Sequence, residues 1–129
     1  MKVLLDTHAF LWWITDDPRL PSRARQIISD NSSDVYFSAV SGWEIAIKAR
    51  LGRLSLAVDN IENFVAQQVA ANAFQVLSIH LNHALRTYSL PDHHKDPFDR
   101  LLVAQAAIEE MALLSADSKL ADYKVRIVW

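Results

Sequence analysis

Four carboxylates lie along this sequence at positions from which they could act together. Asp6 and Asp117 each follow a short apolar run, Glu44 lies in the helical stretch after another such run, and Asp99 lies near the start of a long apolar helical stretch. Carboxylates that share a pocket repel one another and take up protons unless cations neutralise them. Hard divalent ions such as Mg²⁺ and Mn²⁺ prefer oxygen ligands of this kind. A carboxylate pocket holding one or two such ions would polarise a phosphodiester and activate water to hydrolyse it.

Two of the chain's aspartates, Asp96 and Asp99, lie three residues apart in the segment HKDPFDRLLVAQA, residues 94 to 106. Asp96 precedes Pro97, and a proline at the first helical position loses no hydrogen bond there. Asp96 therefore fits the N-cap of the helix that follows. Asp99 falls in the first turn, where an acid also favours the helix dipole, but one cap is sufficient. We therefore predict that Asp96 caps the helix and that Asp99 takes part in the chemistry of a site.

Each of the other acids also has a simpler structural explanation. Asp6 could cap a helix over the segment THAFLWW, and Asp117 could cap a short helix over SKLADY. Glu44 and Lys48 are spaced as an ion pair on one helical face, which contributes only about 0.3 kcal/mol. The sequence alone does not decide between these capping and ion-pair roles and a shared site. It does predict that all four acids fall near one edge of a sheet.

Short apolar runs alternate with helical patterns along the whole chain. The runs that predict strands are residues 2–5, 35–38, 74–79, 113–115 and 125–129. The patterns that predict helices are residues 22–31, 39–52, 60–73, 81–90 and 97–112. Strands that are apolar on both faces favour a parallel sheet covered on both sides, so we predict a single α/β domain over residues 1–129. Sites in such sheets form beyond the carboxyl ends of the strands, which is where the four acids fall.

The composition excludes several classes of protein. The chain has 129 residues, 51% hydrophobic and 22% charged, as expected for one globular domain, and no cysteine for disulfides or thiolate metal sites. A net charge of −2 argues against a broad basic surface for nucleic acid, although an acidic site neutralised by metal ions stays possible. Asp6 interrupts the apolar start, so no signal peptide is expected, and no run reaches the roughly 20 apolar residues of a membrane span. We expect a cytoplasmic protein that does not enter a membrane.

At this point the sequence resembles a known family. The segments LLDTHAFLWW, SAVSGWEIAIK, LPDHHKDPFDRLLVAQA and LLSADSKL, which together extend over most of the chain in order, resemble the PIN-domain ribonucleases. Within that family they resemble the VapC-like toxins of type II toxin–antitoxin systems. The resemblance implies a three-layer α/β/α fold with a parallel sheet of about five strands. It also implies an endoribonuclease that depends on Mg²⁺ or Mn²⁺ and is neutralised by a protein antitoxin.

The resemblance assigns roles to particular residues. It makes Asp6, Glu44, Asp99 and Asp117 the catalytic acids and metal ligands, with Thr7 and Ser115 orienting a ligand or a bound water. It further implies an RNA substrate, a homodimer, and an apolar groove near the site for the antitoxin.

Basic side chains near the acids are candidates for holding RNA phosphates. Lys95 and Arg100 flank the expected site, and Lys48 lies one turn after Glu44. Three histidines also lie close by, at His8, His93 and His94. A loop histidine is more often exposed or bonded to a helix end than catalytic, so their roles stay open.

Two alternatives come from other classes of protein. A receiver-like signalling domain would need adjacent acids after the first strand, where this chain has only Asp6. A Mg²⁺-dependent phosphatase working through an aspartyl phosphate would need a second acid two residues after Asp6, where His8 stands.

Overall fold

The computed structural model describes residues 1–129 and is built around a five-stranded sheet. The strands are β1 (Lys2–Leu5), β2 (Asp34–Ser38), β3 (Gln75–Leu77), β4 (Ala112–Leu114) and β5 (Ile127–Val128). Their order across the sheet is β3-β2-β1-β4-β5, and every neighbouring pair is parallel. Leu4 pairs with Tyr36 on one side and with Leu113 on the other, which makes β1 the central strand.

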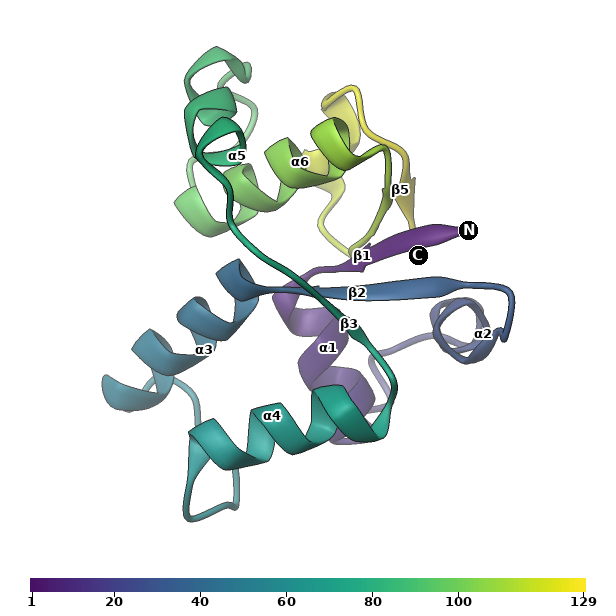
Figure 1. The fold of residues 1–129 in the computed structure, drawn as a ribbon, viewed down its shortest axis with the longest axis vertical. Helices are drawn as coiled ribbons and strands as arrows, with labels where there is room; N and C mark the ends of the chain where they lie inside the picture. Colours follow the sequence, from purple (N-terminus) through teal and green to yellow (C-terminus); the bar gives the residue numbers. More distant parts are fainter.

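Helices cover both faces of this sheet. They are α1 (Thr7–Ile14), α2 (Ser22–Ser29), α3 (Ala39–Arg50), α4 (Ile61–Ala71), α5 (Leu81–Arg86) and α6 (Pro97–Glu109), with 3₁₀ turns η1 (Thr87–Ser89) and η2 (Ser118–Asp122). In Figure 1, α5 and α6 lie above the strands while α1, α2 and α4 lie below them. The expected three-layer α/β/α arrangement with a parallel sheet of five strands is therefore confirmed.

The alternation of side chains along β1 divides the core into two parts. Val3 and Leu5 point to the face packed by α1 and α2 and join the cluster around Phe10. Leu4 points to the other face and packs with Leu102 of α6. All of these side chains are fully buried, and burying each aliphatic one contributes about 1.5–3 kcal/mol. Asp6 therefore follows a central strand that is buried on both faces.

Several predicted boundaries differ from the observed ones. The last helix was expected to reach residue 112, but α6 ends at Glu109, because Glu110 takes up a left-handed backbone with φ 56° and Ala112 already belongs to β4. The strand expected over 74–79 is shorter, and β3 lies at the edge of the sheet, where Val76 is 62% exposed. The helix expected over 81–90 divides into α5 and η1.

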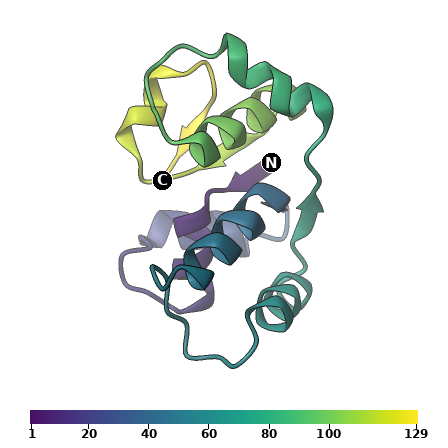
Figure 2. The same ribbon diagram turned by 90° about the vertical axis from the view of Figure 1, so that its left-hand side faces the viewer.

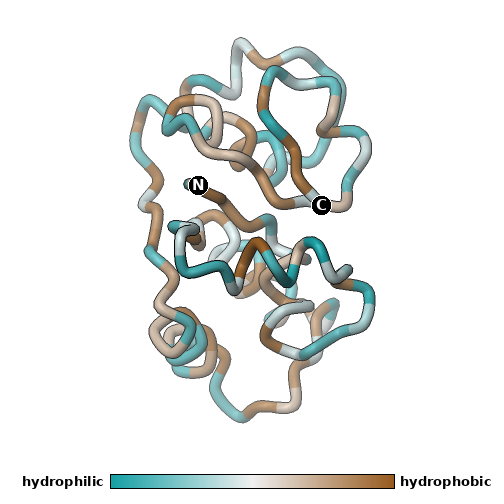
Figure 3. Tube along the Cα trace, turned by 90° about the vertical axis from the view of Figure 1, so that its right-hand side faces the viewer, coloured by the Kyte–Doolittle hydropathy of each residue, from teal (hydrophilic) through white to brown (hydrophobic).

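The carboxyl ends of the strands lie at one common edge of the sheet. Figure 2 faces the edge where β1 and β2 end and where α3 begins, with α6 lying alongside. Figure 3 views the opposite side, where the chain leading inward from the N-terminus is coloured as hydrophobic, in keeping with the burial of Val3 to Leu5. No helix has both the length and the apolar character needed to cross a membrane.

Candidate active site

Asp6 lies at the junction of the central strand and the first helix. Its carboxylate caps α1 by accepting a hydrogen bond from the backbone N–H of Ala9, 2.7 Å away. The side chain is only 6% exposed. Burial raises the pKa of Asp6, hydrogen bonds from Ser115 and Ala9 oppose this rise, and the negative charge of Glu44 adds to it. Asp6 is therefore a buried acid whose ionised form needs a cation nearby.

Asp96 caps α6 as expected, whereas the chemical role of Asp99 stays a prediction. Asp96 is the N-cap of α6 and accepts a hydrogen bond from the backbone N–H of Asp99 over 3.0 Å, with Pro97 in the first turn. Asp99 is left free of that cap. Burial, followed by the charge of Asp96, raises the pKa of Asp99 to about 7, although His94 lowers it. Asp6 and Glu44 also raise this pKa, so the carboxylates of all these residues act on one another.

The two carboxylate oxygens of Asp117 contact two different neighbours. Its Oδ1 accepts a hydrogen bond from the backbone N–H of Lys119, 3.0 Å away, and so caps η2. Its Oδ2 lies 2.8 Å from Nε2 of His94. Burial raises the pKa of Asp117, but the hydrogen bonds from Lys119 and His94 outweigh it and hold the pKa below the ordinary value. Capping and participation in a shared site are therefore compatible, because a carboxylate has two oxygens.

His94, Asp99 and Asp117 form the tightest group of metal-binding side chains. Nε2 of His94 lies 3.3 Å from Oδ2 of Asp99 as well as 2.8 Å from Asp117, and one ligand atom from each residue lies within 4.8 Å of the others. Asp6 and Glu44 do not belong to this group, but their charges raise the pKa of Asp99. The sequence analysis gave His94 no role, because the position of a loop histidine relative to residues 23 positions away is not a sequence pattern.

Glu44 is held at the border of the site by its own partners. The hydroxyl of Thr7 donates to Oε1 of Glu44 over 2.6 Å, and the ammonium group of Lys48 pairs with Oε2. The hydroxyl of Ser41 lies 2.9 Å from that of Thr7. The structure thus brings Thr7 beside a catalytic-acid candidate, while Ser115 accepts a hydrogen bond from the backbone N–H of Asp117, 3.1 Å away. Thr7 and Ser115 therefore each form a hydrogen bond with one of the four acids, and their expected role in orienting a ligand or a bound water stays a prediction.

The basic residues expected to hold phosphate differ in their availability. Lys95 is exposed, and Lys48 is paired with Glu44. Arg100 has a different arrangement, because both terminal nitrogens of its guanidinium donate to oxygens of the protein itself. These acceptors are the carbonyl oxygens of Thr87, Leu90, Pro91 and His94 and the hydroxyl of Tyr123. Arg100 thus holds the loop before α6 in place, and its expected contact with RNA stays a prediction.

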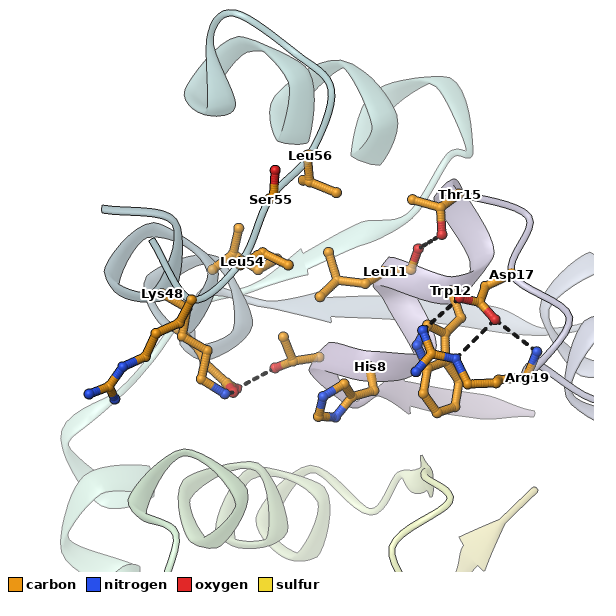
Figure 4. Close-up of a pocket in the computed structure, with 14 residues that line it drawn as sticks. His8, Leu11, Trp12, Thr15, Asp17, Arg19, Lys48, Leu54, Ser55 and Leu56 are labelled. Atoms are coloured by element: carbon orange, nitrogen blue, oxygen red, sulfur yellow. Dashed lines mark hydrogen bonds and ion pairs between the residues drawn. The ribbon is translucent and has the colours of Figure 1, made fainter. Parts of the chain in front are cut away.

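A cleft of about 490 Å³ opens beside the acids, between α1, α3 and the segment 53–56. Figure 4 shows Leu11, Trp12, Leu54 and Leu56 on its apolar walls and Lys48 at the end nearer the acids. The guanidinium of Arg19 lies 4.8 Å from the centre of the Trp12 ring. His8 is exposed in this cleft, whereas His93 packs against the ring of Tyr123 with centroids 5.0 Å apart.

The donor set at the sheet edge suits a hard divalent cation. Three of its acids, Asp6, Asp99 and Asp117, offer carboxylate oxygens, which are the ligands that Mg²⁺ and Mn²⁺ prefer. Two of these acids have raised pKa values, chiefly because they are buried. Lys48, the only ammonium group that forms an ion pair with any of the site acids, is directed at Glu44. A bound cation would remove the repulsion that now raises these pKa values.

Comparisons with known proteins agree with this fold. A model of the PIN-domain family matches residues 3–125. Ribonuclease VapC22 of Mycobacterium tuberculosis (strain ATCC 25618 / H37Rv) is 30% identical over 123 residues, which cover 95% of this chain and 92% of that protein. Among solved structures, VapBC2 from Rickettsia felis bound to a promoter DNA fragment superposes with a TM-score of 0.74 at 11% identity, over 99% of this chain and 98% of that one. A toxin–antitoxin complex from Klebsiella pneumoniae gives a TM-score of 0.68 at 16% identity, over 98% and 96% of the two chains.

Proposed function

Because this chain belongs to the PIN-domain family, we propose that it is a metal-dependent endoribonuclease and the VapC-like toxin of a toxin–antitoxin pair. The observation that carries the proposal is the gathering of Asp6, Asp99 and Asp117 at the carboxyl edge of the sheet, with Glu44 beside them. The name of the 30% identical relative, a ribonuclease, supports the same reaction. The reaction is hydrolysis of a phosphodiester bond within an RNA strand.

One or two Mg²⁺ or Mn²⁺ ions would be held by Asp6, Asp99 and Asp117. When bound, such an ion lowers the pKa of water and stabilises negative charge on a phosphodiester. The raised pKa values of Asp6 and Asp99 support this assignment, because burial disfavours their ionised forms and a bound cation would favour them. The metal preference and the number of ions are part of the proposal.

The chain's other residues would orient the substrate and the acids. Thr7 and Lys48 fix both oxygens of Glu44, so that this carboxylate can accept a proton or order water at the border of the site. Lys95 is exposed next to the cap of α6 and is free to contact an RNA phosphate. Lys48 would contribute positive charge on the opposite side. No side chain is required as a nucleophile.

The cleft beside the acids is the proposed docking site of the antitoxin. Its walls carry Leu11, Trp12, Leu54 and Leu56, and its inner end reaches Glu44 and Lys48. An amphipathic segment of the antitoxin could lay its apolar face on these side chains. Because Glu44, one of the four acids, lines the cleft, an occupant would also obstruct the approach of RNA. This arrangement would couple binding of the antitoxin to loss of activity.

A homodimer would cover an exposed apolar face on the other side of the site. Leu81, Leu85 and Tyr88 follow one face of α5 and η1 and are 75%, 64% and 96% exposed, and Trp43 of α3 is also exposed. Exposed apolar residues that gather in this way mark interaction surfaces more often than chance. A shallow cavity lined by Trp43, Ala84 and Phe98 connects the two helices.

The decisive experiment measures RNA cleavage by the purified chain with Mg²⁺ or Mn²⁺ and with a chelator. We expect metal-dependent fragments from the wild type, loss of cleavage in Asp99→Asn, and full cleavage in Asp59→Asn, an exposed acid in the loop before α4 that serves as the matched control. Expression in cells should arrest growth, and co-expression of the neighbouring open reading frame should relieve the arrest. Intact RNA with both metals, together with unaffected growth, would refute the proposal.

The two alternatives gain no support from the structure. A receiver-like domain and an aspartyl-phosphate phosphatase both need a further acid close to Asp6, and His8 at the second position points into the cleft instead. A phosphoenzyme stable in acid and trapped on Asp6 would revive the phosphatase.

A further inference from the structure

The geometry points to His94 as a positioning residue that donates a hydrogen bond to the metal-binding carboxylates and does not itself bind the metal. This inference rests on the proposed function, because it concerns the same group of acids. The spacing of His94, Asp99 and Asp117 alone would favour a mixed nitrogen and oxygen metal site, since one ligand atom from each lies within 4.8 Å of the others. The hydrogen bond on the far side of the imidazole ring argues otherwise.

Nδ1 of His94 faces a backbone group that can only donate. The N–H of Asp96 points at Nδ1 over 3.0 Å. A neutral imidazole has one protonated and one unprotonated nitrogen. Because Nδ1 must accept the hydrogen bond from Asp96, the proton of the neutral ring is on Nε2. That proton faces two acceptors, Oδ2 of Asp117 at 2.8 Å and Oδ2 of Asp99 at 3.3 Å.

A metal bound at Nε2 would need the opposite tautomer. The proton would then be on Nδ1, directly opposite the N–H of Asp96, and the two donors would repel. The backbone of His94 is also held in place, so the ring cannot shift to avoid this repulsion. The N–H of His94 donates to the hydroxyl of Tyr123 over 3.1 Å, and Arg100 donates to the carbonyl oxygen of His94 over 3.3 Å. The loop therefore holds His94 so that its Nε2–H group donates to the acids. The metal would then be bound by oxygen atoms alone.

The consequence for the site is a fixed orientation of two carboxylates that come from distant segments. Asp117 follows β4, whereas Asp99 lies in the first turn of α6, and His94 joins them through one N–H group. Hydrogen bonds to ligating carboxylates fix their orientation, and losing such a partner typically weakens metal binding by roughly ten- to a hundredfold. His94 would thus act on the metal through Asp117 and Asp99.

Nuclear magnetic resonance of the ¹⁵N-labelled full chain reads the tautomer directly, without RNA. At about pH 8, above the ordinary histidine pKa of about 6.5, we expect His94 to show a protonated Nε2 and an unprotonated Nδ1, both without metal and with saturating Mg²⁺. A proton on Nδ1 in either spectrum would overturn the inference. Because the metal-free spectrum requires neither metal nor activity, this result is distinguishable from failure of the proposed nuclease function.

A second measurement tests whether His94 matters for the metal. Mn²⁺ affinity measured by calorimetry should fall roughly ten- to a hundredfold in His94→Leu and stay unchanged in His93→Leu, the neighbouring histidine that packs on Tyr123. His94→Gln, which keeps an amide N–H near the place of Nε2, should recover much of the affinity. Equal affinity of the His94→Leu and His93→Leu proteins, both folded by circular dichroism, would show that His94 does not position the acids. A wild type that binds no Mn²⁺ would refute the proposed function instead.

Discussion

The hydroxyl of Thr7 donates a hydrogen bond to Oε1 of Glu44 across 2.6 Å, and both side chains are buried. This contact ties the first residue of α1, the helix that follows the central strand, to the second turn of α3, which follows the neighbouring strand. It fixes the distance between the acid at the end of β1 and the acid on α3. The other oxygen of Glu44 pairs with Lys48, so Thr7 and Lys48 together orient this carboxylate.

Replacing Thr7 by valine removes this donor while keeping the shape of the side chain. Because Glu44 is left with an unpaired buried oxygen, we expect the free energy of unfolding to fall by about 1–3 kcal/mol and RNA cleavage to fall with it. Urea unfolding and a cleavage assay would measure the two effects. Thr7→Ser, which retains the hydroxyl, should restore both, and a valine variant as active and stable as the wild type would contradict the assigned contact.

The raised pKa of Asp99 makes the metal-free protein sensitive to pH. With a pKa of about 7 in the folded state against an ordinary value of 3.8, the folded protein binds more protons than the unfolded one between these values. The contribution of Asp99 to stability is therefore full below about pH 4 and is lost as the pH rises towards 7. We expect the stability of Asp99→Asn relative to the wild type to increase over this range, by at most about 1.4 kcal/mol per pH unit, and to level off above pH 7.

Unfolding of both proteins in a chelating buffer at several pH values checks this prediction. The difference between the two proteins is the quantity to follow, because other titrating groups such as Asp6 contribute to both. A difference that does not change between pH 4 and 7 would mean that Asp99 is ionised freely in the folded chain.

Divalent metal should stabilise the folded protein by supplying the positive charge that the acids lack. At a free Mn²⁺ concentration about 100 times the dissociation constant, the gain is expected to be about 2.7 kcal/mol. Thermal unfolding with Mn²⁺, and again after a chelator is added, would measure it. The Asp59→Asn control should gain as much as the wild type, whereas Asp99→Asn should gain little.

Arg100 offers a test between a role in the loop and a role in RNA binding. Lysine keeps the positive charge but cannot reach the several carbonyl oxygens that the planar guanidinium contacts. We expect Arg100→Lys to lose about 1–3 kcal/mol of stability and to cleave more slowly because the loop that carries His94 is loosened. Denaturant unfolding and a KM determination separate the two roles. Unchanged stability with a raised KM would instead place Arg100 on the RNA.

The exposed apolar face of α5 should decide the oligomeric state. Leu85→Asp places a charge at the centre of the face formed by Leu81, Leu85 and Tyr88. We expect sedimentation to show a dimer for the wild type and a monomer for this variant, because burying an unpaired charge in an interface is costly. Glu62→Asp, at an exposed position on α4, is a suitable control. A wild type that sediments as a monomer would remove the homodimer from the proposal.

Much of this arrangement was predictable from local patterns. The order of strands and helices follows from the alternation of apolar runs with helical periods, and Asp96 before Pro97 identified the cap of α6 in advance. Boundaries were less predictable: Glu110 adopts a left-handed backbone that ends α6 early, and β3 is shorter because it lies at the edge. Both outcomes depend on neighbours that a local window of sequence does not contain.

The amino-acid sequence by itself determined which side chains are available for chemistry, since it places Asp6 and Asp117 after predicted strands, Glu44 in the helix after a third strand and Asp99 in the first turn of the long helix. Tertiary structure decided how these acids are used. It directs one oxygen of Asp117 to a helix cap and the other to His94, and it surrounds Arg100 with carbonyl oxygens. The physical reason is that hydrogen bonds between residues far apart in the chain depend on ångström-scale positions, which are set only when the sheet and its helices pack.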